Sequence, residues 1–451
     1  MKKMKHDVPT RLVKVLNLIL MMVAFGFVWY GYYAARAQVH YYRRGDWVVI
    51  LLFGILYYGF CRSYDAFHIS ISPISEIIYS QTLALIISDF IMYVVIWLLS
   101  LYMPNAVPLL ITFGVQLLIS VLWTFLAHQW YFHNFRPGRT AVIYDLREGM
   151  ESLVGEYGME KKFHIEKVLG VEECLEKLSV LDEMDTVFLS GIHSHERNII
   201  LKYCMYQDIQ VYVIPRIGDV IMGGAKKVHM FHLPMLRIDR YRPIPEYTIA
   251  KRAFDILFSG IAIVIASPFM LVTAIAIKSD GGPALYKQKR LTKDGKEFNV
   301  LKFRSMRVDA EKDGVARLST GDKDDRITPV GKVIRKIRFD ELPQLFNILR
   351  GDMSIVGPRP ERPEIARQYE EEMPEFRLRL QAKAGLTGYA QVYGKYNTTP
   401  YDKLLMDLTY IGTPSLWEDF KICLATVKIL FMPESTEGVS EGQTTAMSGK
   451  K

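Results

Sequence analysis

Residues 335–361 read RKIRFDELPQLFNILRGDMSIVGPRPE, and this stretch decides the fold of the C-terminal part of the chain. Asp340 and Glu341 stand side by side just ahead of Leu342 and Pro343, and proline is tolerated in the first turn of a helix. The two carboxylates are therefore expected at or just before a helix N-terminus, where free N–H groups and the helix dipole favour phosphate. One carboxylate could attack phosphorus while its neighbour holds a divalent metal. An acidic N-cap on an ordinary helix is the alternative.

Five further motifs occur in one order around this pair. They are KFRSM (302–306), DAE (309–311), DDRIT (324–328), GDMSIVGPRPE (351–361) and AGLTGYAQV (384–392). Together with DELPQ they resemble the catalytic domain of the bacterial sugar transferases, the polyprenyl-phosphate phosphoglycosyl transferases with a monotopic fold. The resemblance covers residues 251–431, roughly two fifths of the chain.

The resemblance implies an enzyme that starts exopolysaccharide, capsule or O-antigen synthesis. Such an enzyme moves a sugar 1-phosphate from a UDP-sugar to undecaprenyl phosphate and releases UMP. In this reading Asp340 is the nucleophile and Mg²⁺ is the cofactor, with Glu341 and Asp309 as its ligands. Glu311 and Asp324 are further candidates for metal or uridine contacts.

Basic side chains in the same block are candidates for holding the donor's phosphates. Lys302 and Arg304 alternate with apolar residues, so a strand would project both cations from one face. Arg359 lies between two prolines, which leaves its backbone little freedom and lets its guanidinium be aimed at low entropic cost. Arg326 is the fourth candidate for substrate binding. Gly385 and Gly388 suggest a tight loop where the backbone approaches a ligand.

Residues 251–278 form an apolar segment long enough to span a bilayer. Ser267 and Pro268 stand at its middle, where proline removes a backbone hydrogen bond and kinks a helix. Basic residues flank both ends, and a spanning helix would place one of these clusters outside. We therefore predict a re-entrant helix with its break at Ser267-Pro268, which keeps both clusters at cytoplasmic head groups. A kinked spanning helix is the alternative.

Four apolar segments precede this block, and we expect them to form a four-helix transmembrane domain over residues 1–135. They cover residues 12–33, 47–61, 74–102 and 107–126. An even number of crossings puts both ends in the cytoplasm, in agreement with the basic residues on either side. Asp89 in the third segment is either a functional ionisable group or a side chain that pairs with Ser or Tyr inside the bundle.

Residues 136–243 have a different pattern. AVIYDL, DTVFLSG and IQVYVIP alternate with helix-like segments, which predicts a Rossmann-like α/β middle domain with a parallel sheet. A dinucleotide site needs a Gly-rich turn after the first strand, and YDLREG (144–149) stands there instead. We therefore expect a regulatory or packing role. The catalytic domain is placed at residues 244–433, and the tail over 434–451 is expected to be disordered.

The expected fold class is thus an α+β membrane protein of the cell inner (cytoplasmic) membrane, multi-pass, with its catalytic domain on the cytoplasmic face. The chain is 50% hydrophobic and carries a net charge of +8, which suits contact with a lipid bilayer and phosphorylated ligands. No nucleic-acid partner is expected, because the charges are not gathered into a basic helix or patch. Four scattered cysteines imply neither a zinc site nor a disulfide framework.

Two other classes of protein stay open. A membrane-bound nucleotide-sugar dehydratase would share the front helices and the α/β domain, although it requires the missing Gly-rich turn. A non-catalytic scaffold of a polysaccharide assembly complex would need an inactive dyad. The sequence leaves open which sugar is transferred and whether the protein is a homodimer.

Overall fold

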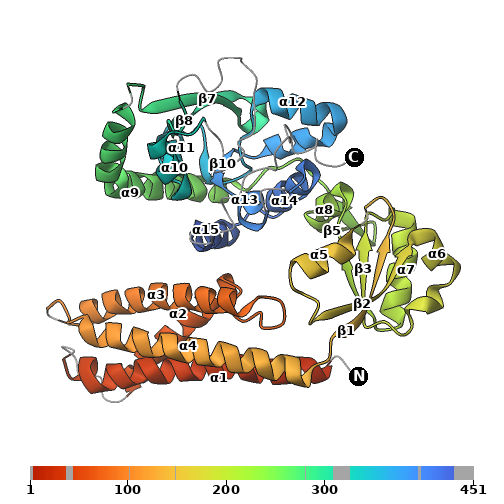
Figure 1. The fold of residues 1–451 in the computed structure, drawn as a ribbon, viewed down its shortest axis with the longest axis horizontal. Helices are drawn as coiled ribbons and strands as arrows, with labels where there is room; N and C mark the ends of the chain where they lie inside the picture. The colour runs from red at the N-terminus through yellow and green to blue at the C-terminus, as the bar shows by residue number, and fades with distance from the viewer. Residues whose placement is uncertain are drawn as a thin grey trace. The chain divides into compact units, whose positions relative to one another are not determined.

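The computed structural model describes residues 4–36, 44–100, 102–147, 149–279, 281–307, 326–394 and 398–430. By packing, the chain divides into two compact units, Met1–Ile214 and Pro215–Lys451. The first unit holds α1 to α4 and a parallel sheet, and the second holds the long apolar helix α9 (Figure 1). The carboxylate pair also belongs to the second unit. Within the described residues, five helices are long and apolar enough to cross a membrane. The predicted mixture of apolar helices and α/β structure is confirmed at this level.

The four front helices match the four apolar segments. They are α1 (Met4–Val28), α2 (Arg44–Ser63), α3 (Ile74–Leu99) and α4 (Val107–Asn134). Consecutive helices pack against one another, and α1 also packs against α4. Helix α4 extends to Asn134, well past residue 126 where the apolar segment ends, and its last turns are rich in His and aromatic residues.

A network of buried polar side chains links all four of these helices. Gln81 of α3 accepts hydrogen bonds from Ser120 of α4 (2.7 Å) and from Asn17 of α1 (3.5 Å), and it donates to the carbonyl of Ala66 (3.3 Å). Tyr57 of α2 donates to the Asn17 amide oxygen at 2.9 Å. Because a buried polar group is costly without partners, this network fixes one arrangement of the helices.

Asp89 does not make the pairing with Ser or Tyr that the sequence suggested. It is 6% exposed, and within the part of the chain that the structure describes neither carboxylate oxygen has a hydrogen-bond partner. The side-chain amide of Gln116 on α4 is also buried, and within the described residues neither its nitrogen nor its oxygen has a hydrogen-bond partner. The predicted pairing is therefore wrong, while the alternative of a functional group stays a prediction.

A four-stranded parallel sheet completes the first unit, with strand order β2-β1-β3-β4. Its strands and helices are β1 (Gly138–Tyr144), α5 (Met150–Glu156), β2 (Phe163–Gly170), α6 (Val171–Glu176), β3 (Thr186–Ser190), α7 (Ser194–Tyr206) and β4 (Gln210–Val213). In register, Val142 on β1 is opposite both Val168 on β2 and Phe188 on β3. The parallel sheet is confirmed, and β2 is a strand that the sequence analysis missed.

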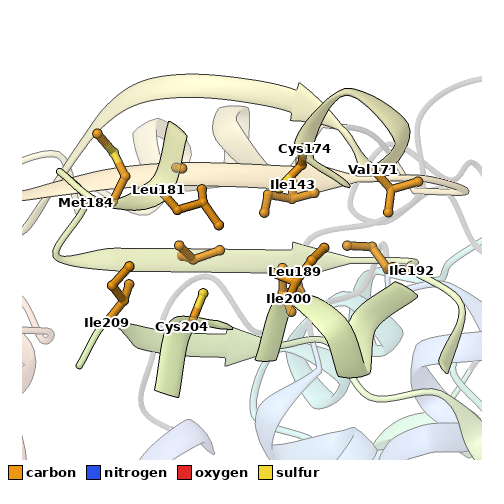
Figure 2. Packing of buried hydrophobic residues seen from close by; sticks show 12 residues of the cluster. Ile143, Val171, Cys174, Leu181, Met184, Leu189, Ile192, Ile200, Cys204 and Ile209 are labelled. Atoms are coloured by element: carbon orange, nitrogen blue, oxygen red, sulfur yellow. The ribbon is translucent and has the colours of Figure 1, made fainter. Parts of the chain in front are cut away.

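The core of this sheet is apolar and includes two free thiols. Cys174 of α6 and Cys204 of α7 lie in one cluster with Ile143 of β1 and Leu189 of β3 (Figure 2). All four of these side chains are buried. The cluster accounts for the alternation of strands and helices, since each helix covers the sheet with one apolar face.

The second unit begins earlier than the predicted boundary at residue 244. It opens with α8 (Ile217–Gly223) and an antiparallel hairpin of β5 (Lys226–Met230) and β6 (Leu233–Arg237). Ile217 and Val220 of α8, with Tyr241, pack against the apolar core that α14 and α12 build in this unit. Residues 215–243 therefore belong by packing with the C-terminal unit, not with the sheet domain.

Helix α9 (Pro245–Lys278) is the long apolar helix of this unit. Its helical residues run through Ser267 and Pro268 without interruption, yet α9 changes direction along its length (Figure 1). Pro268 has no N–H to give the carbonyl four residues earlier, and the Ser267 hydroxyl donates to that carbonyl, Val264 O, at 2.8 Å. At the predicted break a side chain thus replaces the missing donor and the helix continues, while the re-entrant course of α9 stays a prediction.

The remaining elements surround the carboxylate pair. They are β7 (Leu285–Leu291), β8 (Glu297–Phe303), α10 (Pro329–Lys336), the 3₁₀ turn η6 (Phe339–Glu341), α11 (Gln344–Arg350), β9 (Ser354–Val356), α12 (Pro363–Glu372), η7 (Pro374–Gln381), β10 (Gly385–Thr387), α13 (Tyr389–Tyr393), α14 (Pro400–Gly412) and α15 (Leu416–Leu430). Strands β7 and β8 form a hairpin, and β9 pairs in parallel with β10.

Candidate active site

Asp340 and Glu341 lie in the short turn η6 between α10 and α11. Arg338 has φ of 54°, a left-handed conformation that reverses the chain after α10. Helical backbone then continues through Leu342 and Pro343 into α11. The two carboxylates therefore sit just before a helix, as the sequence predicted, and the turn holds them on a backbone with little freedom.

Glu341 is held by two cations from separate parts of the chain. Its Oε1 accepts a hydrogen bond from Lys302 Nζ at 2.9 Å and from Arg359 Nη2 at 3.1 Å. Burial opposes ionisation of this carboxyl, but Lys302 and Arg359 outweigh that effect and hold the pKa of Glu341 well below its usual range. Glu341 is therefore an ionised group whose position is fixed on both sides.

Asp340 differs from its neighbour. Among the residues that the structure describes, its carboxylate makes no hydrogen bond or ion pair. Burial raises the pKa of Asp340, and the charge of Glu341 adds to that rise, while Lys302 and Arg335 oppose it. One carboxylate of the pair is thus engaged and the other is available to react.

A small pocket, open to solvent, lies beside Glu341. It is lined by Arg290, Val300, Lys302, Glu341, Gln344, Arg359, Pro360, Gly385 and Leu386. Three of these side chains are basic, so the pocket concentrates positive charge around a fixed carboxylate. Such a lining suits a phosphorylated ligand whose charge the basic groups balance.

The segment that carries Arg359 is fixed through its main chain. The carbonyls of Pro358, Arg359, Pro360 and Glu361 each accept a hydrogen bond from a different group. The donors are Gly385 N (2.9 Å), Arg379 Nη2 (2.8 Å), Arg290 Nη1 (3.2 Å) and Leu291 N (2.9 Å), in that order. The predicted rigid turn is present, and its rigidity comes from these bonds as well as from the prolines.

Glycines allow two loops to meet beneath this segment. A Cβ on Gly385 would lie 2.1 Å from Gly357 N, and a Cβ on Gly388 would lie 2.2 Å from Gly357 O. Any side chain at these positions would push the loops apart. The close approach that the structure shows is to the backbone of Gly357, whereas the predicted approach of this loop to a ligand stays a prediction, with Gly385 in the pocket lining.

The expected pair of cations on one strand face does not form. Strand β8 ends at Phe303, so Arg304 lies beyond it. The Arg304 guanidinium is buried and donates to three main-chain carbonyls, those of Pro283, Met306 and Ile277. Its geometry favours a structural role, and binding of substrate by Arg304 stays a prediction.

The other predicted residues are less informative. Arg326 lies next to a short bridge between Met306 and Ile327, and its carbonyl accepts from Arg307 N at 2.9 Å. Asp309, together with Glu311 and Asp324, lies outside the described residues. Their proposed contacts with metal, sugar donor or uridine stay predictions.

Two positioning residues were missed by the sequence analysis. Asn347 on α11 is fully buried, accepts from Leu301 N (2.9 Å) and donates to Asn299 O (2.9 Å). It therefore fixes β8, which carries Lys302, against the helix that follows the dyad. Arg290 lines the pocket, and burial lowers its pKa to about 10 in spite of nearby Glu361. An Asn inside an otherwise apolar helical stretch was the available signal for Asn347.

Helix α9 is attached to the site at both of its ends. Near its start, Arg252 donates to the carbonyls of Ile348 (2.6 Å) and Leu349 (2.7 Å) at the end of α11. Asp255 accepts from Ile355 N at 2.9 Å on β9. At its other end, Ile277 O accepts from Arg304 at 3.2 Å. The long apolar helix is therefore part of the framework that holds the dyad.

A divalent cation fits the carboxylate pair in its donor chemistry. Oxygen ligands are what Mg²⁺ prefers, and one or two carboxylates with substrate phosphates usually suffice. Glu341 Oε1 is taken by Lys302 and Arg359, which leaves Oε2 as the oxygen that would reach a metal. Within the described ranges, no group of three or more His, Cys, Asp or Glu side chains gathers around a metal-sized space.

A pocket lined by a fixed carboxylate and several basic groups, with a second carboxylate next to it in sequence and a long apolar helix in the same unit, is typical of a membrane-associated enzyme of phosphorylated substrates. Residues 246–433 match the family model described as bacterial sugar transferase. The chain belongs to this family.

Three curated relatives illustrate the match. A "UDP-N-acetylgalactosamine-undecaprenyl-phosphate N-acetylgalactosaminephosphotransferase" of Aeromonas hydrophila is 40% identical over 234 residues, which is 51% of this chain and 54% of that protein. A "UDP-glucose:undecaprenyl-phosphate glucose-1-phosphate transferase" of Caulobacter vibrioides is 40% identical over 201 residues, 43% of this chain and 74% of that protein. An "Undecaprenyl-phosphate galactose phosphotransferase" of Salmonella typhimurium is 38% identical over 236 residues, 49% of each chain. The chain thus spans about half the length of the first and third.

Proposed function

We propose that this protein transfers a sugar 1-phosphate from a UDP-sugar to undecaprenyl phosphate and releases UMP. The observation that carries the proposal is the unequal environment of the two carboxylates. Glu341 is fixed by Lys302 and Arg359, whereas Asp340 has no such partner among the described residues. The family and the three relatives supply the substrate class.

In the first step an Asp340 carboxylate oxygen attacks the β-phosphorus of the UDP-sugar. A bond forms between that oxygen and phosphorus, and the bond from phosphorus to the oxygen shared with the α-phosphate breaks. UMP leaves with the bonding pair, and the sugar 1-phosphate stays on Asp340 as an acyl phosphate. Lys302 and Arg359 lie where they can balance charge on the diphosphate during this step.

In the second step a phosphate oxygen of undecaprenyl phosphate attacks the same phosphorus. The bond from phosphorus to Asp340 breaks, which restores the free carboxylate and gives a lipid diphosphate sugar. Glu341 and Asp309 would hold Mg²⁺, and the ion would supply neutralisation of phosphate charge when bound. Asp340 is charged when it reacts, so the raised pKa places a lower pH limit on activity.

Helix α9 would enter the membrane and return on the same side. Its two ends are attached to the same unit, through Arg252 and Asp255 at one end and through Ile277 O at the other. Between them, apolar side chains such as Val264 and Val272 are about 70% exposed, which suits contact with lipid acyl chains. The change of direction along α9, which contains Pro268, supports this arrangement.

Exposed apolar residues next to the dyad would continue the membrane contact. Val333 and Ile337 at α10 and Phe346 on α11 are exposed, and Lys332 and Lys336 flank the first two in sequence. This mixture of apolar and basic side chains is typical of a surface in the head-group layer. The lipid phosphate would then meet Asp340 without leaving that layer.

The front helices would cross the inner membrane as a four-helix transmembrane domain, and the catalytic unit would face the cytoplasm, where UDP-sugars are made. The basic residues ahead of α1 and after α4 support this orientation. The sheet domain lacks a Gly-rich turn after β1, so we assign it a regulatory or packing role.

The test is to incubate purified protein with undecaprenyl phosphate and a panel of UDP-sugars and to measure UMP release. Asp340→Asn should abolish turnover and also the sugar-phosphate adduct seen by intact mass in wild-type protein without the lipid acceptor. Glu341→Gln should keep a slow rate with a greater demand for Mg²⁺. Substantial turnover by Asp340→Asn would contradict the assignment of the nucleophile.

A further inference from the structure

Arg379 is a buried cation outside the pocket, and its guanidinium reaches the segment that carries Arg359. It is 3% exposed and lies on η7. Its Nη2 donates to the main-chain carbonyl of Arg359 at 2.8 Å. This hydrogen bond links η7 to the residue whose side chain contacts Glu341.

Asp407 fixes the direction of Arg379. This carboxylate lies on α14 and is 1% exposed. Its Oδ2 accepts a hydrogen bond from Arg379 Nε at 2.9 Å and lies 2.7 Å from Arg379 Nη2. Glu361 stands farther away, with its Oε1 3.7 Å from Arg379 Nη1. A planar guanidinium that is held on one edge by a carboxylate can present its remaining N–H in only one direction.

The place of this pair suggests more than stability. Two buried charges lose hydration, and an apolar pair of similar size would stabilise a core equally well or better. Prolines on both sides fix the φ angles of residues 358 and 360 and restrict the backbone of Arg359, so the direction of the Arg359 carbonyl depends on few remaining torsions. The ψ torsion of Arg359 sets the direction of its carbonyl, and Arg379 hydrogen-bonds to this carbonyl.

We propose that Arg379, oriented by Asp407, is a positioning residue that sets the direction of the Arg359 side chain toward Glu341 and the donor's diphosphate. The inference deepens the proposed function and rests on it for its effect on rate. Arg379 does not itself line the pocket described above and contacts neither carboxylate of the dyad, so it acts through Arg359.

The experiment compares Arg379→Lys with Arg377→Lys, a matched change at an exposed arginine two residues away. Lysine keeps the charge beside Asp407 but cannot hold that carboxylate and the Arg359 carbonyl in one plane. We expect Arg379→Lys to lower kcat about 10- to 100-fold, with little change in KM for the UDP-sugar or in the unfolding midpoint. Arg377→Lys should match wild type in all three. Wild-type kcat for Arg379→Lys would overturn the proposal.

A double-mutant cycle separates positioning from a general structural role. If Arg379 acts through Arg359, then Arg379→Lys should change kcat less than about twofold in an Arg359→Ala background. If the fold-losses in kcat of the two single variants multiply in the double variant, the proposal is overturned. If Arg379→Lys does not fold, Asp407→Asn serves in the same cycle, because it keeps the size of the side chain.

A readout that needs no turnover keeps this inference distinct from the proposed function. Phenylglyoxal modifies exposed guanidinium groups, and peptide mass spectrometry gives the rate at Arg359. We expect faster modification of Arg359 in Arg379→Lys and an unchanged rate in Arg377→Lys. An unchanged rate in both variants would contradict positioning, whereas absence of UMP release from wild-type protein would contradict the proposed function alone.

Discussion

At the scale of single residues, the site separates two neighbouring carboxylates by what surrounds them. Glu341 has its charge balanced by Lys302 and Arg359, so it stays ionised and fixed. Asp340 has its pKa raised by burial and keeps its oxygens for a substrate. The same backbone turn therefore supplies one group for holding and one group for reacting.

The pH dependence of activity should follow Asp340. Only the ionised form attacks, so the rate should fall as pH is lowered through the raised pKa of Asp340. Arg335 lowers that pKa by its positive charge, hence Arg335→Gln should move the acid limb of the kcat/KM profile to higher pH. Lys336→Gln, a neighbouring charge removal on an exposed side chain, is the control and should leave the limb in place. If the acid limb moves to lower pH in Arg335→Gln, then the limb belongs to a group other than Asp340.

Much of this site could be predicted from the sequence, because its parts lie close together along the chain. The dyad turn and the proline-flanked Arg359 were predicted from local rules alone. Arg304 was not, because the alternation that predicted its direction holds only while the strand lasts, and β8 ends one residue earlier. Its partners, Ile277 O and Pro283 O, depend on tertiary packing that spacing cannot reveal.

At the scale of elements, α9 shows how a proline is accommodated inside an apolar helix. Lipid cannot satisfy a free carbonyl, so the carbonyl that Pro268 leaves without its helical donor needs another donor inside the protein. Ser267 provides it by donating to Val264 O. The sequence predicted a helix break here, but the helix runs through Pro268 without interruption, because the rule for proline counts the lost N–H and not a nearby hydroxyl.

We expect Ser267→Ala to destabilise the catalytic unit by about 1–3 kcal/mol, since the Val264 carbonyl would lose its donor. Thr273→Val is the matched control, because the Thr273 hydroxyl donates to Phe269 O, a carbonyl that the helix can already satisfy. Thermal unfolding in detergent or nanodiscs would compare the two variants. Equal small losses would mean that the Ser267 hydroxyl is not needed.

The membrane topology of α9 can be read from thiol labelling. Single cysteines at Ala250 and Ser279, in a background without the four native cysteines, should both be protected from an impermeant reagent in intact cells. Both should react once the cells are opened. Labelling of only one position in intact cells would mean that α9 crosses the membrane.

At the scale of the whole molecule, the compact C-terminal unit begins at Pro215, about thirty residues before the start predicted for the catalytic domain. Residues 215–243 follow the parallel sheet directly in the sequence, and the prediction assigned them to the sheet domain. Their apolar side chains instead fill the core beside α14, where Leu404 and Leu408 are buried. Strand β2 was missed because it lies at the edge of the sheet, where exposed residues such as His164 and Glu166 alternate with residues that are only partly buried.

A fragment that begins at Pro215 should therefore be more stable than one that begins at Ile244. The shorter fragment loses Ile217, Val220 and Tyr241 from the core, along with the bond from Tyr241 N to Gln381 Oε1 at 3.0 Å. We expect a loss of several kcal/mol and a matching fall in UMP release for the shorter fragment. Equal unfolding midpoints and equal rates would show that residues 215–243 contribute nothing to the catalytic unit.

The attachment of α9 at both ends has a consequence for the lipids that the enzyme can use. A helix that crosses a bilayer must tilt or stretch its surroundings when the hydrocarbon layer becomes thicker or thinner. Under the proposed return of α9, the height of Asp340 depends on a single leaflet, through Arg252 and α11 at one end and Arg304 at the other. The length of the lipid acyl chains would then affect the front helices, but it would not change how the Asp340 carboxylate approaches the phosphate of the lipid acceptor.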